Sequence, residues 1–204
     1  MTSTTATKTV RDAAVHRVSI RKYTDQPISE ELMNEILDTA GRAPSPWNVQ
    51  PWRVTVVRDA EMKQKLMGAA YGQPQVGAAT AVLVVASDMK DAVDHAEDFV
   101  HPGMADRTAE LAQSTRDMFG KMGDEKSDEW GFAESNIFLG YLLLALESHG
   151  IGSSPMLGFD PAQVRELLGM HDRVRIPALV AIGYPAEAGF PQFRHPLSRW
   201  TKTV

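Results

Sequence analysis

The chain has 204 residues, of which 43% are hydrophobic and 23% are charged, and its formal net charge is -5. This is the composition of an ordinary globular domain, and the overall charge does not favour binding to a nucleic-acid backbone. The absence of cysteine excludes disulfides, iron–sulfur clusters and thiol catalysis, and it fits the cytoplasmic location that we expect.

The first nine residues are rich in threonine and contain no apolar stretch, so we expect a disordered arm here and no secretory signal. A single domain is expected to cover residues 10–204. Its most apolar run, residues 137–146, is too short to span a bilayer. Neither a membrane nor a nucleic acid is therefore an expected partner.

Helix and strand patterns alternate along this domain. Ser29 is a good N-cap for a helix that ends near Arg42, and Asp160 with Pro161 opens a later helix. Further helices are predicted at residues 60–70 and from 127 or 128 to about 149. Strands are predicted at residues 53–57, 80–86 and 176–182. The pattern indicates an α+β fold with long helices and about four strands.

Two helical regions carry a functional expectation. Residues 88–128 are the most polar part of the chain, but Thr108, Leu111, Thr115 and Met118 recur at helical spacing, which predicts a helical insertion. Residues 137–146 are apolar on all sides of the long helix that contains them. Such a helix is covered either by its own core or by a second subunit, and we expect a subunit interface.

A proline-rich segment at residues 44–52 links the first long helix to the first strand. It holds three of the twelve prolines and two of the four tryptophans, Trp47 and Trp52. A stiff loop can hold Ser45, Asn48 and Gln50 toward a ligand with little entropy lost on binding. The alternative is an ordinary stiffened connection whose two tryptophans pack into the core, and we interpret the tryptophans mainly in this way.

Several kinds of chemistry have no sequence support. Neither of the common glycine-rich nucleotide loops is present, and no serine lies in a nucleophile elbow. His95, Glu97, Asp98 and His101 lack a recognised metal-ligand spacing, so we interpret them as a solvated surface and expect no metal.

Basic residues near the two ends of the domain point to an anion. Arg17, Ser19 and Arg21 alternate, so they face one side if the segment is extended. Two guanidinium groups and a hydroxyl on one side suit a phosphate, although a solvated basic segment would have the same spacing. Near the other end, Arg194 lies between stiffening prolines, and Arg199 could play the same role.

Four segments together resemble the FMN-dependent nitroreductase family. Residues 16–23 are similar to its opening Arg-x-Ser-x-Arg/Lys motif, and residues 43–52 resemble its Pro-Ser-x-x-Asn-x-Gln-Pro-Trp loop. Residues 150–159 look like its turn over the flavin ring, and residues 194–196 match its C-terminal Arg-x-Pro. The segments occur in the family's order and span most of the chain.

The resemblance implies a nitroreductase-like fold with a mixed, mostly antiparallel sheet flanked by helices, in an intertwined homodimer with two FMN molecules at the interface. The implied contacts to the phosphate and ribityl end are Arg17, Ser19, Arg21 and Arg194. Those from the partner subunit are Pro44, Ser45, Pro46 and Asn48. Those along the isoalloxazine are Pro155, Met156, Leu157 and Gly158, with Gln73 at its polar edge.

The chain departs from the family's pattern at two positions. Gln192 stands where the family has a second basic residue, and Pro46 stands where many members have serine. Phosphate neutralisation would then rest on three arginines. The insertion at residues 88–128 carries no family motif and lies where members shape their substrate pockets.

The resemblance also implies an activity, in which NAD(P)H gives a hydride to flavin N5 and an oxidised acceptor such as a nitroaromatic or quinone then receives the electrons, by a ping-pong mechanism. No catalytic side chain is required, because flavin N5 carries the chemistry. The alternatives are a narrower flavin reaction (reductive dehalogenation, enone reduction or flavin-dependent oxidation) or a flavin storage protein with little turnover.

Overall fold

A computed structural model describes residues 7–204, and residues 1–6 of the predicted arm lie outside the described part. Lys8 and Thr9, at the end of the predicted arm, contact the rest of the domain. The Lys8 backbone N–H donates to the Ser148 carbonyl at 3.1 Å. The Thr9 hydroxyl accepts from the Asp12 N–H and so caps helix α1 (Val10–His16). The domain therefore begins a few residues earlier than its sequence pattern indicated.

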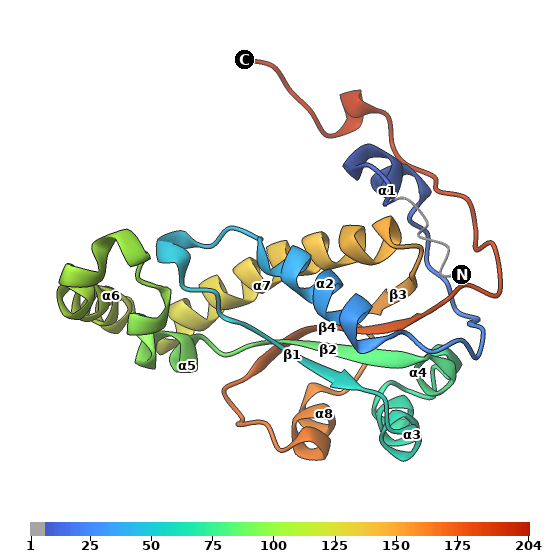
Figure 1. Cartoon of the computed structure of the whole chain (residues 1–204), viewed down its shortest axis with the longest axis horizontal. Coiled ribbons are helices and arrows are strands. Elements are labelled where there is room, and N and C mark those ends of the chain that lie inside the picture. Colours follow the sequence, from blue (N-terminus) through green and yellow to red (C-terminus); the bar gives the residue numbers. More distant parts are fainter. Residues whose placement is uncertain (1–6) are drawn as a thin grey trace.

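Four antiparallel strands form the sheet, in the order β1-β2-β4-β3 (Figure 1). The strands are β1 (Trp52–Val57), β2 (Ala81–Ser87), β3 (Gly152–Met156) and β4 (Arg175–Gly183). The expected antiparallel pairing is confirmed. Among the described residues, the parallel pairing is confined to an isolated bridge between Ser19 and Ser153.

Helices cover both faces of this sheet (Figure 1). They are α1, α2 (Glu30–Gly41), α3 (Ala60–Ala69), α4 (Pro74–Ala78), α5 (Met89–Asp94), α6 (Thr108–Met122), α7 (Asp124–Ser148) and α8 (Pro161–Leu168). Short 3₁₀ helices are η1 (Pro46–Asn48), η2 (Ala96–Phe99), η3 (Pro102–Arg107) and η4 (Leu197–Arg199). The region predicted as a helical insertion thus contains α5, η2, η3 and α6.

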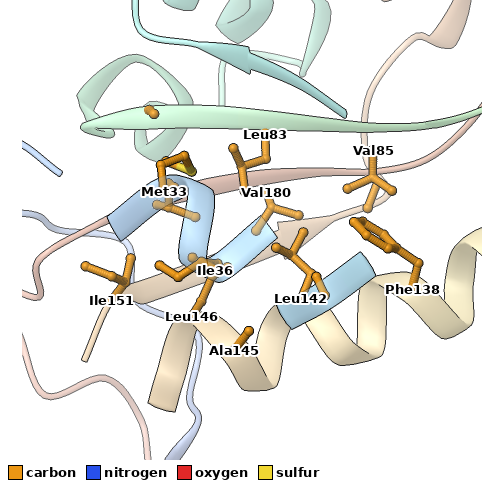
Figure 2. Packing of buried hydrophobic residues seen from close by; sticks show 14 of the residues in the cluster. Met33, Ile36, Leu83, Val85, Phe138, Leu142, Ala145, Leu146, Ile151 and Val180 are labelled. Atoms are coloured by element: carbon orange, nitrogen blue, oxygen red, sulfur yellow. The ribbon is translucent and has the colours of Figure 1, made fainter. Parts of the chain in front are cut away.

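Alternation along β2 creates two cores. Leu83 and Val85 face the layer of α2 and α7, where they meet Phe138, Leu142 and other apolar side chains (Figure 2). Val82 and Val84 face the opposite layer, formed by α3, α4 and α8. Because successive side chains of a strand point to opposite faces, a strand that is apolar throughout needs cover on both sides.

Two predicted boundaries were wrong. Residues 152–156, which we assigned to a turn, form the edge strand β3 beside β4. Proline is tolerated there because an edge strand has one unpaired side, so Pro155 removes no ladder bond. The long helix α7 begins at Asp124, before the predicted start, because Gly123 at φ 84° separates it directly from α6.

The outer face of α7 is apolar but uncovered in the single chain. Phe138 and Leu142 are buried, whereas Ile137 and Tyr141 on the other side of the helix are 45% and 42% exposed. Further exposed apolar side chains lie in the tail that leaves the body near α1 (Figure 1). They are Phe190, Phe193, Leu197 and Trp200. Within residues 7–204, no helix is both long enough and apolar enough to cross a membrane.

Candidate functional site

An arginine-lined cavity of about 260 Å³ lies where the two ends of the domain meet. Arg17 follows the last turn of α1, and Ser19 bridges to β3 through Ser153. Arg21 and the tail residue Arg194 complete the lining. The structure thus brings together all four residues that the sequence assigned to a phosphate, and we name them the arginine pocket.

Hydrogen bonds between side chains and backbone groups hold the tail against this pocket. The Gln192 amide donates to the Ala14 carbonyl at 2.9 Å and to the Arg17 carbonyl at 2.6 Å. The Arg21 N–H donates to the Glu187 carboxylate at 2.7 Å. Gln192 therefore replaces no charge in the pocket. It fixes the position of Arg194 instead, a role that the sequence did not reveal.

The three arginines of the pocket give it an excess of positive charge. The Arg17 Nη1 atom is buried and has no hydrogen-bond partner among the described residues. Burial, followed by repulsion from Arg194, lowers the pKa of Arg17 below its ordinary value, against an opposing effect of Glu147. A buried guanidinium without a partner is costly. A phosphate bound here would supply the missing acceptor and counter-charge, so the pocket fits the phosphate end of FMN.

The expected contacts to the ring lie further along β3. The Ile20 N–H donates to the Ser153 carbonyl at 3.0 Å, which places the arginine segment beside this strand. Leu157, just after the strand, is 74% exposed. The Gln73 amide donates to the Gly158 carbonyl at 2.7 Å, so these two candidate residues are brought together.

Met156 and Pro155 differ from this exposed edge. The Met156 side chain is buried in the core of α3, α4 and α8, so this residue can offer a ligand only backbone atoms. Pro155 lies in the edge strand and is half-buried. The part of the segment that is open to a ligand is therefore Leu157 and Gly158.

The proline-rich loop lies elsewhere and has an unusual backbone. Trp47, Asn48 and Gln50 have φ values of 53°, 58° and 48°, in the left-handed region. The Gln50 N–H donates to the Ser45 hydroxyl at 3.0 Å, and the Asn48 amide donates to the Phe99 carbonyl at 3.2 Å. Pro44 and Pro46 are exposed. The loop is thus internally braced and still presents polar and apolar groups to solvent.

The two tryptophans of this loop have different environments. Trp52 stacks on Phe138 at 5.2 Å and is partly buried, in agreement with its predicted packing role. The same interpretation was wrong for Trp47, which is 55% exposed. Its position at positive φ between two exposed residues turns its ring away from the main core, toward α6 and α7.

The loop and the arginine pocket lie at opposite ends of α7 (Figure 1). Trp47 stacks on Trp130 in the first part of α7. Arg17 interacts electrostatically with Glu147, which lies in the last turn of α7. At 1.5 Å per residue, the two positions are about 25 Å apart along the axis. In one chain, the loop therefore does not face the arginine pocket.

Two other candidates lie outside the arginine pocket. Arg199 lies on η4 and does not line the cavity. His95 contacts Asp91, and residues 7–204 contain no group of three or more side chains arranged to hold a metal ion.

Comparison with known proteins adds a family to this geometry. A model of the Nitroreductase family matches residues 14–184.

The chain belongs to the nitroreductase family.

Three similar proteins each match more than nine-tenths of this chain. This nitroreductase-family chain is 50% identical over 190 residues to a Thermus thermophilus protein named NADH dehydrogenase, with 93% of each chain covered. It is 29% identical over 189 residues to a Bacillus subtilis protein named FMN reductase (NAD(P)H), covering 92% of this chain and 70% of that one. An Exiguobacterium sibiricum protein solved in complex with FMN has a TM-score of 0.88 and 29% identity, covering 99% of this chain and 100% of that one.

Proposed function

We propose that this chain is an FMN-dependent oxidoreductase that uses NAD(P)H to reduce an organic acceptor such as a nitroaromatic or a quinone. One observation carries the proposal: the Nη1 atom of Arg17 is buried without a hydrogen-bond partner among the described residues, beside Arg194 in the arginine pocket. The family and the names of the relatives agree with it. When bound, FMN supplies a two-electron carrier that neither core of the protein provides.

The residues of the chain bind and orient in this proposal. Arg17, Arg21 and Arg194 hold the phosphate as forked, charged donors, and the Ser19 hydroxyl adds a further hydrogen bond. Gln73 and Gly158 meet the polar edge of the ring. No general acid or base is needed, which fits a site whose candidate side chains are arginine, amide and apolar groups.

We further propose a homodimer in which each flavin site draws on both subunits. The separation of the loop from the arginine pocket supports this arrangement, because a second copy in the opposite orientation brings its loop to the first copy's pocket. The exposed apolar face of α7 and the aromatic tail supply an interface. Pro44, Ser45, Pro46 and Asn48 then reach the flavin of the partner.

The kinetic order and location complete the proposal. The donor and the acceptor use the same face of the site in turn, so we propose ping-pong kinetics. We place the protein in the cytoplasm, in keeping with its lack of cysteine.

The decisive experiment is anaerobic mixing of the FMN-loaded protein with NADH and, separately, NADPH. We expect the yellow colour to bleach with at least one of them and to return when menadione or nitrofurazone is added. Bleaching with neither donor would refute the reductase and would favour a flavin storage protein.

A further inference from the structure

Trp47 occupies a conformation that few large residues adopt. It lies in the left-handed region at φ 53°, and its side chain remains 55% exposed. Such a backbone conformation costs energy in a residue other than glycine, and it persists only where neighbouring groups hold it. A half-exposed indole held at this cost is a candidate for function.

Two aromatic side chains hold the Trp47 ring in place. It stacks on Trp130 of α7, with ring centroids 6.3 Å apart and planes at 28°. It also meets the ring of Phe119 of α6 at 6.1 Å, nearly edge-on at 76°. Phe119 is buried in a small core with Val49, and Trp130 packs against that core. We name Trp47, Trp130 and Phe119 the aromatic wall. It joins the proline-rich loop to the α6 insertion.

The wall has the chemistry of a stacking surface. Two cations of the nearby insertion are engaged by carboxylates, Arg116 by Glu97 and Lys90 by Asp94. In the described part of the chain, the one cation–π contact is Arg175 over Phe132, which is not part of the wall. Phe119 is buried and Trp130 supports Trp47 from behind, so the surface that the wall offers is the exposed part of the Trp47 indole. An indole is apolar and electron-rich, and it attracts electron-poor flat rings.

The place of Trp47 in the loop connects the wall to the acceptor. Trp47 lies between Pro46 and Asn48, two residues proposed above to reach the partner's flavin. Its ring then lies beside that flavin, at the border formed by the insertion. The reacting ring of an acceptor must lie over the flavin, so a second fused ring is the part that can extend sideways to the wall.

We propose that the aromatic wall selects flat, electron-poor acceptors with two fused rings, such as nitronaphthalenes and naphthoquinones, over acceptors with a single ring. This inference rests on the proposed function, because it places the wall at the same site. Trp47 acts in it as a specificity-determining residue and takes no part in electron transfer itself.

The first test measures binding without turnover. The oxidised, FMN-loaded protein is titrated with 1-nitronaphthalene and with nitrobenzene in the absence of a donor, and the flavin absorbance is followed. We expect W47A to weaken 1-nitronaphthalene about tenfold and nitrobenzene less than twofold, and W47F to retain most of the affinity. F132L is the matched control, since Phe132 lies on the same helix but faces Arg175, and it should change neither affinity.

A second variant guards against a defect of the loop. W130L leaves the loop sequence intact and removes the stacking partner of Trp47, so it should also weaken 1-nitronaphthalene selectively. If W47A and W130L both bind 1-nitronaphthalene as tightly as the unmodified protein, the inference is overturned. Equal losses for the two ligands would overturn it as well, because they would show a general defect.

Turnover separates this inference from the function on which it rests. With NADH or NADPH as the donor, W47A should lower kcat/KM for 1-nitronaphthalene about tenfold and kcat/KM for nitrobenzene less than twofold. A protein that binds 1-nitronaphthalene through Trp47 but is bleached by neither donor would uphold the wall and refute the reductase.

Discussion

The arginine pocket and the proline-rich loop, at opposite ends of α7, are built in different ways. The pocket is held by a backbone hydrogen bond to β3 and by side-chain hydrogen bonds to the tail, and it brings three arginines together, one of which has a buried Nη1 atom without a hydrogen-bond partner among the described residues. The loop has three residues at positive φ and is held by the insertion, through the Phe99 carbonyl and the Phe119 ring.

This difference indicates that the pocket and the loop have separate roles. A pocket attached to the sheet can keep the same geometry in every relative, so it suits the recognition of a cofactor. A loop attached to the insertion changes whenever the insertion changes, so it suits the choice of acceptor. In the proposed homodimer the two parts meet across the subunit interface, so each can be altered without disturbing the fold of the other.

The largest effect is expected from a variant that prevents the pocket of one subunit from meeting the loop of the other. I137K places a charge on the exposed apolar face of α7, and an unpaired charge in an interface costs roughly 2–5 kcal/mol. We expect a monomer that has also lost FMN, as measured by analytical ultracentrifugation with detection of flavin absorbance. A162K, on the exposed surface of α8 across the sheet, is the control. A flavin-loaded I137K monomer would contradict the two-subunit site.

A narrower change affects the pocket alone. R17A removes a charge-assisted contact to the phosphate, so FMN affinity should fall by about 1.5–3 kcal/mol, while the dimer persists. Fluorescence titration of the protein freed of flavin measures this. K22A removes an exposed charge of the same segment that does not line the cavity, and it should have little effect. Equal affinities in R17A and K22A would argue against the phosphate assignment.

Between the two ends, α7 carries a buried carboxyl group that neither end uses. Glu134 is 4% exposed, and neither of its oxygens has a hydrogen-bond partner among the described residues. Burial raises its pKa from 4.5 to about 7. Between these two pKa values the folded state binds the proton of Glu134 more tightly than the unfolded chain does. The contribution of Glu134 to the free energy of unfolding is therefore fully present below pH 4.5 and is lost as the pH rises through 7.

E134Q should remove this dependence. Urea unfolding at fixed protein concentration should show that E134Q gains roughly 2 kcal/mol relative to the unmodified protein between pH 5 and pH 8. E129Q changes an exposed glutamate on the same helix, so it serves as the control and should follow the unmodified protein. Parallel pH profiles for E134Q and the unmodified protein would mean that this carboxyl group is not protonated in the fold.

The smallest expected effect concerns the tail. Q192A removes the donor to the Ala14 and Arg17 carbonyls, so Arg194 loses its fixed position while every charge remains. FMN affinity should fall by about 1 kcal/mol, less than for R17A. A double-mutant cycle with R194A should then show that the two losses are not additive. Full additivity would mean that Gln192 does not act through Arg194.

The sequence predicted best what local patterns encode. Capping at Ser29 and Asp160 located the starts of α2 and α8. Alternation in the arginine segment predicted that Arg17, Ser19 and Arg21 face the same side, because an extended backbone alone places alternate residues on one side. β3 was missed because its residues 152–156 contain glycine, serine and proline and no β-branched side chain, so it is a strand only through its pairing with β4.

Contacts between parts of the chain that are distant in sequence could not be predicted from such local patterns. Nothing near Gln192 indicates that its amide would bond to carbonyl groups at the end of α1. The exposure of Trp47 depends on a left-handed backbone at residues 47 and 48, and such a conformation is not favoured by tryptophan itself. A glycine there would have been a signal.

The Gln192 clamp also sets an order of assembly. The bond from its amide to the Arg17 carbonyl joins positions 175 residues apart, so it forms only after nearly all of the chain has emerged from the ribosome. Contacts of such long range are closed late in folding, because the entropy of the large loop must be overcome first. Flavin uptake should therefore wait for a finished polypeptide, and protease cleavage within the exposed tail should release the cofactor from a domain that is otherwise still folded.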